Sequence, residues 1–493
     1  MKLRKHQSDY VDLTRGKKVF AVLAEMGVGK SAMIIAEWGE RESAGTMDDL
    51  LIIAPAGSYR NWDQDKSDEQ PSQFKVHMPA DLFERSMIVA WISGASKTHQ
   101  KRLDNLLAKR NGPRVLVMNI EALSSTIKAR QYCEAFLTVE GRRTMVVVDE
   151  STTIRNDSQR TREVLKLKEH ANVRRILTGL VTPKSPLDLF HQFEFLDLRI
   201  LGHRSIYSFR ERYTVMKTIM APGTKVGPDG KTKPRKVKVV VAFKNQEELH
   251  AKIAPYSYRV LKEDCLDLPP KIYQRREVEL TDDQKRIYND LILFSTAQLS
   301  ATAHVTPTMV MTRLLRLHQV VCGHSVDDVG IEHDIKSNRI DSLMELLDEH
   351  SGKVIIWSNY RKEIAKIAQR LEEEYGEGSV AQFHGGNKTS RGEEERQFLG
   401  NPNCRFMIAT QSAGGRGNTW VNANLVVYFS NSHDLELRMQ SEDRAHRDGL
   451  KHSVTYVDLV APGTIDEKIL QALRQKLNMA TLISGEKYRE WLI

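Results

Sequence analysis

The residues best suited to chemistry lie near the start of the chain, between an apolar run and a helical pattern. This segment, Glu25–Ser31, contains Gly27, Val28, Gly29, Lys30 and Ser31. In a glycine-permitted turn, backbone N–H groups point toward a phosphate, a lysine ammonium reaches the β and γ phosphates, and a hydroxyl ligates Mg²⁺. The full pattern has glycine where this chain has Ala24. A glycine turn that binds nothing is the alternative, but the agreement of apolar run, turn, Lys-Ser pair and helix favours a phosphate site.

Two adjacent carboxylates, Asp149 and Glu150, end the apolar run Met145–Glu150. A carboxylate at the end of a strand can hold Mg²⁺, and a second one can orient or deprotonate an attacking water. Acidic pairs also occur as plain turns. Because Lys30 and Ser31 lie upstream in the same expected sheet, we predict that Asp149 and Ser31 hold the metal and that Glu150 positions the water.

A pair of arginines, Arg444 and Arg447, lies in the charged segment Gln440–Gly449. Residues three apart lie on one face of a helix, so both arginines are expected to reach the same target. A solvated charged helix is the bland alternative. Since this part of the chain has no phosphate loop of its own, we predict that the two arginines act as fingers toward a nucleotide held elsewhere in the chain.

Short apolar runs alternate with helical patterns in two series, which favours parallel sheets with function at the carboxyl ends of their strands. The first series is Val19–Leu23, Leu50–Pro55, Arg114–Asn119, Met145–Glu150 and Arg174–Gly179. The second series, which begins near Ser337, is Lys353–Ser358, Ser379–Gly386, Arg405–Thr410 and Leu425–Phe429. Between them the alternation is lost from about Leu201 to Lys271, and helical periodicity returns from Thr281. We expect an α/β fold with two parallel-sheet lobes in tandem and a partly helical insertion between them. The predicted boundaries are 1–200, 201–330 and 331–493, with a C-terminal helix in the last part.

The composition is that of a globular protein with a basic excess. The 493 residues are 40% hydrophobic and 28% charged, with a formal charge of +9, which favours a polyanionic partner. The cysteines are scattered and form no CxxC pair, which indicates free thiols in a reducing compartment and neither zinc nor disulfides. They are Cys133, Cys265, Cys322 and Cys404. No signal peptide or membrane span is evident, so we expect a cytoplasmic or nucleoid-associated protein.

Much of the basic excess lies in one stretch, Lys217–Lys244, which has eight basic residues against Asp229 alone. Gly and Pro interrupt it, so we predict a loop. A solvated charge run is the alternative to a loop that contacts nucleic-acid phosphates. The residues expected to make these contacts are Lys231, Lys233, Arg235 and Lys236.

The order and spacing of these motifs resemble the superfamily-two helicases, and within them the Swi/Snf-type DNA translocases. The similarity covers nearly the whole chain, including the connector Leu268–Lys271 and the lobe-two motifs around Phe383–Gly385 and Thr410–Asn418. It implies RecA-like lobes that bind ATP with Mg²⁺. It also implies that Gln7 reads adenine, which suits a side-chain amide that both donates and accepts, and that Gly417 contacts the nucleotide. The nucleic-acid contacts that it implies are Trp62, Asn119, Thr178, His384 and Thr410.

The chain departs from the family pattern at the positions through which relatives couple nucleotide to nucleic acid. The usual Asp-Glu-x-His box ends here in Ser151-Thr152, the usual Thr-Pro after Leu-Thr-Gly is Leu180-Val181, and a common asparagine is Lys184. The resemblance implies an ATP-driven motor that moves along duplex DNA, with no membrane partner. A strand-separating DNA or RNA helicase and a catalytically weak nucleic-acid-binding module stay open as alternatives. The Leu-Thr-Gly motif argues against the RNA version, because RNA-type members carry Ser-Ala-Thr there.

Overall fold

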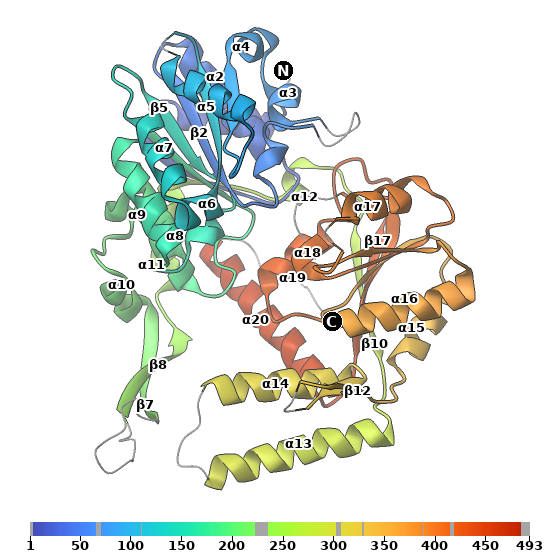
Figure 1. The fold of residues 1–493 in the computed structure, drawn as a ribbon. Coiled ribbons are helices and arrows are strands. Elements are labelled where there is room, and N and C mark those ends of the chain that lie inside the picture. The colour runs from blue at the N-terminus through green and yellow to red at the C-terminus, as the bar shows by residue number, and fades with distance from the viewer. Residues whose placement is uncertain are drawn as a thin grey trace. The chain divides into compact units, whose positions relative to one another are not determined.

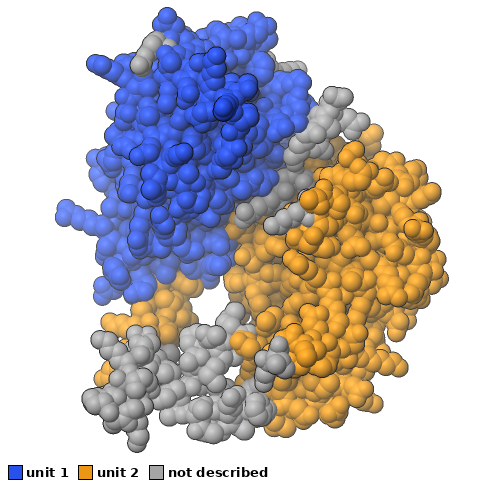
Figure 2. All heavy atoms as spheres, viewed as in Figure 1, with its two compact units in different colours: residues 1–213, 245–267, 479–488 blue, residues 214–244, 268–478, 489–493 orange. Residues whose placement is uncertain are grey.

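The computed structural model describes residues 3–65, 71–109, 111–221, 235–301, 307–327, 330–387, 389–414 and 419–484. Figure 1 shows the fold, and Figure 2 shows its division into two compact units. The first unit comprises residues 1–213, 245–267 and 479–488, and the second comprises residues 214–244, 268–478 and 489–493. Within the described part of the chain, no helix combines the length and apolar character needed to span a bilayer.

The first unit is built on a seven-stranded sheet in the order β3-β4-β2-β5-β6-β1-β9, and all its strand pairs are parallel. Its strands are β1 (Val19–Ala24), β2 (Asp49–Ala54), β3 (Met87–Ala90), β4 (Arg114–Asn119), β5 (Thr144–Val148), β6 (Val173–Thr178) and β9 (Ser257–Val260). The central strands are buried on both faces, as their uninterrupted apolar runs predict. Strands β3 and β9 were not anticipated, because four residues give too short a pattern.

Twelve helices of the described chain belong to this unit. Apolar side chains of several of these helices pack with those of the strands in the hydrophobic core of the unit. They are α1 (Lys5–Thr14), α2 (Lys30–Ser43), α3 (Gln73–His77), α4 (Ala80–Arg85), α5 (Lys97–Ala108), α6 (Ile120–Ser125), α7 (Ile127–Leu137), α8 (Gln159–Leu167), α9 (Leu189–Leu201), α10 (Ile206–Tyr213), α11 (Gln246–Ile253) and α12 (Lys262–Cys265). The carboxyl ends of β1 and β5 carry the predicted phosphate loop and acidic pair.

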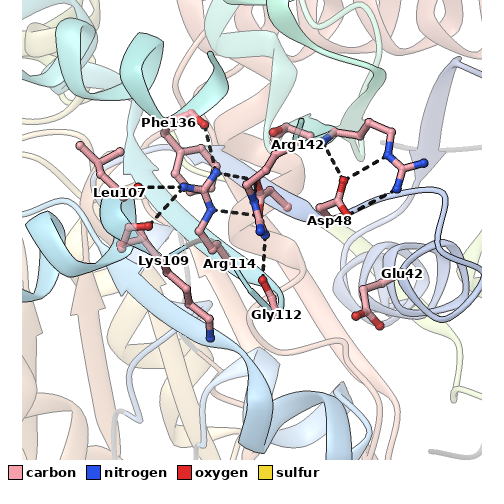
Figure 3. A network of polar contacts seen from close by, with 12 residues as sticks. Glu42, Asp48, Leu107, Lys109, Gly112, Arg114, Phe136 and Arg142 are labelled. Carbon is pink, nitrogen blue, oxygen red and sulfur yellow. Dashed lines mark hydrogen bonds and ion pairs between the residues drawn. The ribbon is translucent and has the colours of Figure 1, made fainter. Parts of the chain in front are cut away.

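A charge network surrounds the buried Asp49 at the amino ends of the sheet's strands. Figure 3 shows Arg114 and Arg142, which belong to it. The Arg114 guanidinium donates to both carboxylate oxygens of Asp49, at 3.1 and 2.6 Å, and Arg142 Nε donates to one of them at 2.9 Å. Arg142 Nη2 also donates to Asp49 and, at 2.8 Å, to the carbonyl of Gly112, and Arg114 Nη2 donates to the carbonyl of Phe136 at 3.3 Å. The network ties together the segments that enter β2, β4 and β5.

Replacing Asp49 by asparagine is expected to lower the free energy of unfolding of the first unit by about 3–5 kcal/mol, because it removes the carboxylate that pairs with the buried Arg114 and the half-buried Arg142. The matched control is Asp48→Asn. Asp48 pairs with the exposed Arg143, and such a pair contributes about 0–1 kcal/mol. Chemical denaturation followed through the near-ultraviolet signal measures both variants. Equal effects of the two substitutions would contradict the structural role of Asp49.

The second unit is built on a six-stranded sheet in the order β10-β17-β16-β13-β15-β14, again with every pair parallel. Its strands are β10 (Lys271–Glu277), β13 (Lys353–Trp357), β14 (Val380–Phe383), β15 (Phe406–Ala409), β16 (Ala423–Tyr428) and β17 (Val454–Val460). Its helices are α13 (Asp282–Ala301), α14 (Pro307–Val321), α15 (Arg339–Asp348), α16 (Arg361–Tyr375), α17 (Arg391–Gly400), α18 (Gln411–Gly414), α19 (Leu435–Glu442) and α20 (Ile465–Ser484), whose last residues fall in the first unit. A small antiparallel pair, β11 (His324–Val326) and β12 (Glu332–Asp334), follows α14. Two parallel-sheet α/β lobes with helical segments between them confirm the predicted fold class, whereas the boundaries at 200 and 330 stay predictions.

The basic stretch that we predicted as a loop is, where described, an antiparallel hairpin of β7 (Thr214–Ala221) and β8 (Arg235–Phe243). The prediction was wrong for these residues because the charges obscured the β-branched residues of Val237–Val241, which favour a strand. Lys236 and Lys238 are exposed and lie two residues apart, so they share one face of the hairpin. Arg235 begins β8, and Lys231 and Lys233 lie outside the described residues.

Candidate nucleotide and nucleic-acid site

The predicted phosphate loop connects β1 to α2 in a conformation that only glycine adopts without strain. Gly27 and Gly29 have φ of 84° and 88°, in the left-handed region. A Cβ atom at Gly29 would also lie 2.3 Å from the side-chain nitrogen of Gln7. Lys30 begins α2, so the first backbone N–H groups of this helix belong to the loop. The local geometry is therefore that of an anion-binding turn.

The Lys30 ammonium spans this turn, because it donates to the carbonyl oxygens of Ala24 at 3.0 Å and Glu25 at 3.3 Å. Ser31 follows in the first turn of α2, and its hydroxyl forms no hydrogen bond to another described residue. Both side chains are half-buried. The lysine and the serine are thus in place to meet a phosphate and its metal ion.

The acidic pair follows β5 directly. The Asp149 carboxylate accepts from the indole N–H of Trp62 at 3.1 Å and from the backbone N–H of Glu150 at 3.0 Å. Burial raises the pKa of the Asp149 carboxyl, and the nearby Lys30 charge and these hydrogen bonds oppose that shift without cancelling it. Lys30 therefore lies close enough to Asp149 for its charge to act on this carboxyl, whereas the roles of the two residues stay predictions.

Glu150 has φ 50° and ψ 58°, and Asn245 is the other non-glycine residue with positive φ in the described chain. A left-handed conformation costs a residue of this kind on the order of 1–3 kcal/mol, and such strain gathers at functional sites. The turn begins the 3₁₀ segment Ser151–Ile154. The strain marks Glu150 as a residue whose position the surrounding fold enforces.

Helix α1 lies against the phosphate loop. The Gln7 side chain accepts from the backbone N–H of Arg4 at 3.0 Å and directs its amide nitrogen to the carbonyl of Val28 at 3.5 Å, and His6 Nε2 lies 2.9 Å from the same carbonyl. A cavity of about 710 Å³ opens beside this helix start and the edge strand β9. Gln7 is 8% exposed, and its side chain contacts the phosphate loop. Its contact with adenine stays a prediction.

The residues expected to contact nucleic acid divide by burial. Trp62 is 2% exposed, and its ring packs on Phe74 while its indole N–H donates to Asp149. Thr178 is 1% exposed, and its hydroxyl donates to the carbonyl of Leu180 at 2.8 Å. Asn119 is half-buried and caps α6 through the N–H of Glu121. In the second unit, His384 and Thr410 are partly exposed and follow the neighbouring strands β14 and β15. These last three residues keep the accessibility that a nucleic-acid contact requires.

The two arginines do not share a helix face, because α19 ends at Glu442. Arg444 is fully buried, and its Nε donates to the carbonyl of Gln440 at 2.9 Å. Arg447 is half-buried, with Nη1 donating to Thr419 Oγ1 at 2.9 Å. The expectation that both reach one target rested on a helix that does not continue. Gly417, predicted to contact the nucleotide, lies outside the described residues.

Family models match most of this chain. A model described as the SNF2-related domain matches residues 12–326, and one described as the helicase conserved C-terminal domain matches residues 338–449. The chain belongs to the SNF2-related domain family. This confirms the family that the motifs indicated.

Individual proteins are similar to this chain at low sequence identity. The chain is 24% identical over 483 residues to an uncharacterized ATP-dependent helicase of Mycoplasma genitalium, with 96% of this chain and 41% of that protein covered. It is 24% identical over 396 residues to the TATA-binding protein-associated factor MOT1 of Saccharomyces cerevisiae, with 69% and 20% covered. It thus spans about two fifths and one fifth of their lengths. The Sulfolobus solfataricus SWI2/SNF2 ATPase core in complex with dsDNA aligns with 22% identity, 99% and 94% coverage and a TM-score of 0.40.

Two departures from the SNF2-related pattern are joined by a fully buried side chain, Gln192. Ser151 Oγ donates to Gln192 Oε1 at 2.7 Å, and Gln192 Nε2 donates to the carbonyl oxygens of Val181 at 3.1 Å and Asp188 at 2.7 Å. The segments after Glu150 and after Gly179 are therefore held together. Gln192 was not predicted as a site residue, since nothing in its local sequence pattern marks it.

A second missed group anchors α19 of this SNF2-related chain. Glu442 accepts from Lys271 at 3.0 Å, from Tyr273 at 2.8 Å and from Arg438 at 2.9 Å. Burial alone would raise the pKa of Glu442, but the charges of Lys271 and Arg438 hold it below its usual value. Arg438 also binds both carboxylate oxygens of Asp458 on β17, at 2.6 and 3.0 Å. The connector lysine thus fixes the helix that precedes Arg447.

Proposed function

We propose that the chain hydrolyses ATP and uses the energy to move along duplex DNA. The observation that carries this proposal is the phosphate loop of the first unit in an SNF2-related chain. The loop has two positive-φ glycines, and the charge of its Lys30 acts on the carboxyl of Asp149. A phosphate-binding turn beside a strand-terminal carboxylate is the arrangement that nucleotide hydrolysis requires. A relative described as an ATP-dependent helicase supports the use of ATP.

The residues of this site suit distinct roles in the reaction. Lys30 and the loop N–H groups bind the β and γ phosphates. Ser31 and Asp149 offer the hydroxyl and carboxylate oxygens that Mg²⁺ prefers, and the Ser31 hydroxyl is not engaged by other described residues. Bound Mg²⁺ would neutralise charge on the phosphate oxygens. Glu150 orients the attacking water and accepts its proton.

The cavity beside α1 is the proposed place of the adenine base. It is lined by Arg4, His6 and Tyr258, among others, and the Tyr258 hydroxyl donates to the carbonyl of His6 at 3.0 Å. Its volume of about 710 Å³ is within the usual range for small-molecule sites. Gln7, whose side chain lies against Val28 and Gly29, would link a base bound beside α1 to the phosphate loop.

Arg447 is the proposed finger, and Arg444 is assigned a structural role because its guanidinium is buried. A finger contributes when the second unit comes within reach of the nucleotide held by the first, since its charge is needed as charge develops on the γ phosphate. The network of Lys271, Glu442 and Arg438 positions the segment from which Arg447 extends.

The proposed partner is duplex DNA, bound through its phosphates. The formal charge of +9 and the exposed Lys236 and Lys238 of the hairpin supply cations, and Asn119, His384 and Thr410 supply accessible polar groups at strand ends. Phosphate contacts of this kind position a protein without reading sequence.

Replacing both Lys236 and Lys238 by serine is expected to weaken duplex binding evenly across sequences. Each lost phosphate contact should flatten the log–log salt dependence by about 0.9, while ATP turnover without DNA stays unchanged. Fluorescence anisotropy over a series of salt concentrations measures both quantities. The control is the Lys166→Ser, Lys285→Ser double variant, which removes the same charge from helices α8 and α13. If the hairpin variant matches this control, the hairpin is only solvated.

The proposed function is tested by measuring phosphate release from ATP by the intact chain alone and with duplex DNA, single-stranded DNA or RNA. We expect turnover that duplex DNA stimulates more than the other two polymers do. Lys30→Ala protein sets the background, because it lacks the cation that faces the β and γ phosphates. Turnover no higher than this background under all four conditions would contradict the proposal.

A further inference from the structure

A second cavity, with several basic lining residues, lies in the first unit at the amino ends of the strands of its sheet. Its volume is about 580 Å³, a usual size for a small-molecule site. It is lined by the end of α2 and by the segments that lead into β1, β2, β5 and β6. Its basic lining residues are Lys18, Arg41, Arg143, Lys168 and Arg174, and Glu169 is the acidic lining residue among those described.

Some of these cations are already engaged by the protein. Arg41 Nε donates to Glu37 at 2.9 Å, and its Nη2 donates to the backbone oxygens of Thr14 and Lys17. Arg143 Nε lies 3.1 Å from a carboxylate oxygen of Asp48, a residue that is labelled in Figure 3. These two arginines therefore form the wall of the cavity and keep little capacity for a ligand.

Lys18 and Arg174 differ, because neither side chain forms an ion pair or hydrogen bond with another described residue. The two residues are neighbours, since the N–H of Arg174 donates to the carbonyl of Lys18 at 2.8 Å. Burial lowers the pKa of Arg174 despite the opposing charges of Asp197 and Glu169, so its cationic form is not fully compensated. Asn172 adds a donor, because its Oδ1 accepts from the N–H of Thr144 at 2.8 Å and leaves its Nδ2 for another acceptor.

We propose that this cavity binds a small phosphate-bearing anion, with Lys18 and Arg174 as its charge partners and Asn172 as a neutral donor. An anion is favoured because it would compensate two adjacent cations, neither of which forms an ion pair with a described carboxylate. The concave shape and small volume favour a compact anion over a polymer backbone. The site is distinct from the phosphate loop, since the two lie at opposite ends of β1, whose six residues span roughly 20 Å.

The test uses the intact Lys30→Ala protein, in which the phosphate loop is disabled, and inorganic pyrophosphate as the probe. Isothermal titration at constant ionic strength should show saturable binding. Adding Lys18→Gln or Arg174→Gln in this background should weaken binding at least tenfold for each substitution. Lys166→Gln, which removes an exposed charge from nearby α8, should leave binding unchanged. Lys18 is exposed, so its substitution tests the site even where Arg174→Gln perturbs folding.

Three results would overturn the proposal. The first is the absence of saturable pyrophosphate binding in Lys30→Ala protein. The second is an affinity of the Lys18→Gln variant equal to that of the Lys166→Gln control. The third is loss of affinity for a short DNA duplex in the Lys18→Gln variant without any pyrophosphate binding, which would assign this face to nucleic acid. None of these results depends on ATP turnover, so the proposed function is tested separately.

Discussion

Replacing Glu150 by glutamine is expected to leave ATP bound while its hydrolysis falls by about 10²–10⁴-fold, the usual contribution of a positioned general base. Glutamine keeps the size and hydrogen-bonding reach of the side chain but cannot accept the proton of the attacking water. Because the left-handed turn at Glu150 is imposed by the backbone, the amide should occupy the same place. Nucleotide binding by equilibrium dialysis and phosphate release by a coupled assay measure the two effects.

Lys30→Ala provides the contrast in the same assays. It should lose both turnover and affinity, since the ammonium contacts the phosphates in the ground state as well as in the transition state. Normal turnover by Glu150→Gln protein would refute the role of Glu150. Equal losses of affinity in the two variants would show instead that the substitution damages the loop.

Replacing Arg447 by alanine is expected to lower the maximal rate of hydrolysis by roughly 10³–10⁵-fold, the range known for arginine fingers, with little loss of ATP affinity. The asymmetry follows because a finger acts mainly on charge that develops in the transition state. Steady-state kinetics should therefore show a reduced kcat and a nearly unchanged KM. Arg396→Ala, an exposed arginine on α17 of the same unit, is the matched control and should behave as the unaltered protein.

Arg444→Ala should act differently, although the sequence places the two arginines as equals. Its guanidinium is fully buried, so the substitution should lower the stability of the second unit before it affects chemistry. A kinetic defect in Arg444→Ala at unchanged thermal stability would reverse the assignment of the two residues. A rise in KM without loss of kcat in Arg447→Ala protein would contradict the role of Arg447 as an arginine finger.

The strands were predictable where a segment is apolar throughout. Val19–Leu23 and Leu425–Phe429 are uninterrupted apolar runs, and both form buried strands. Strand β10 was missed because Lys271–Glu277 is largely polar, and its place is determined by pairing with β17 and by the ion pair between Lys271 and Glu442. The hairpin β7–β8 was missed because its basic residues obscured the β-branched residues of Val237–Val241, which favour a strand.

The candidate site divides in the same way. The turn of Gly27–Lys30 and the acidic pair after β5 could be predicted, because short local patterns specify both. The burial of Trp62 and Arg444, the early end of α19 and the link through Gln192 could not, because they depend on packing between segments far apart in the chain. The motifs therefore indicated candidate site residues, but not which of their side chains are buried.

The central claim, movement along duplex DNA driven by ATP, is tested most directly by displacement of a third strand from a DNA triplex. A motor that translocates on the duplex should release the third strand when ATP is present and leave the two duplex strands paired. Glu150→Gln protein should bind the same substrate and release nothing. If the unaltered protein hydrolyses ATP but never displaces the third strand, or instead separates the duplex strands, the translocase account is contradicted.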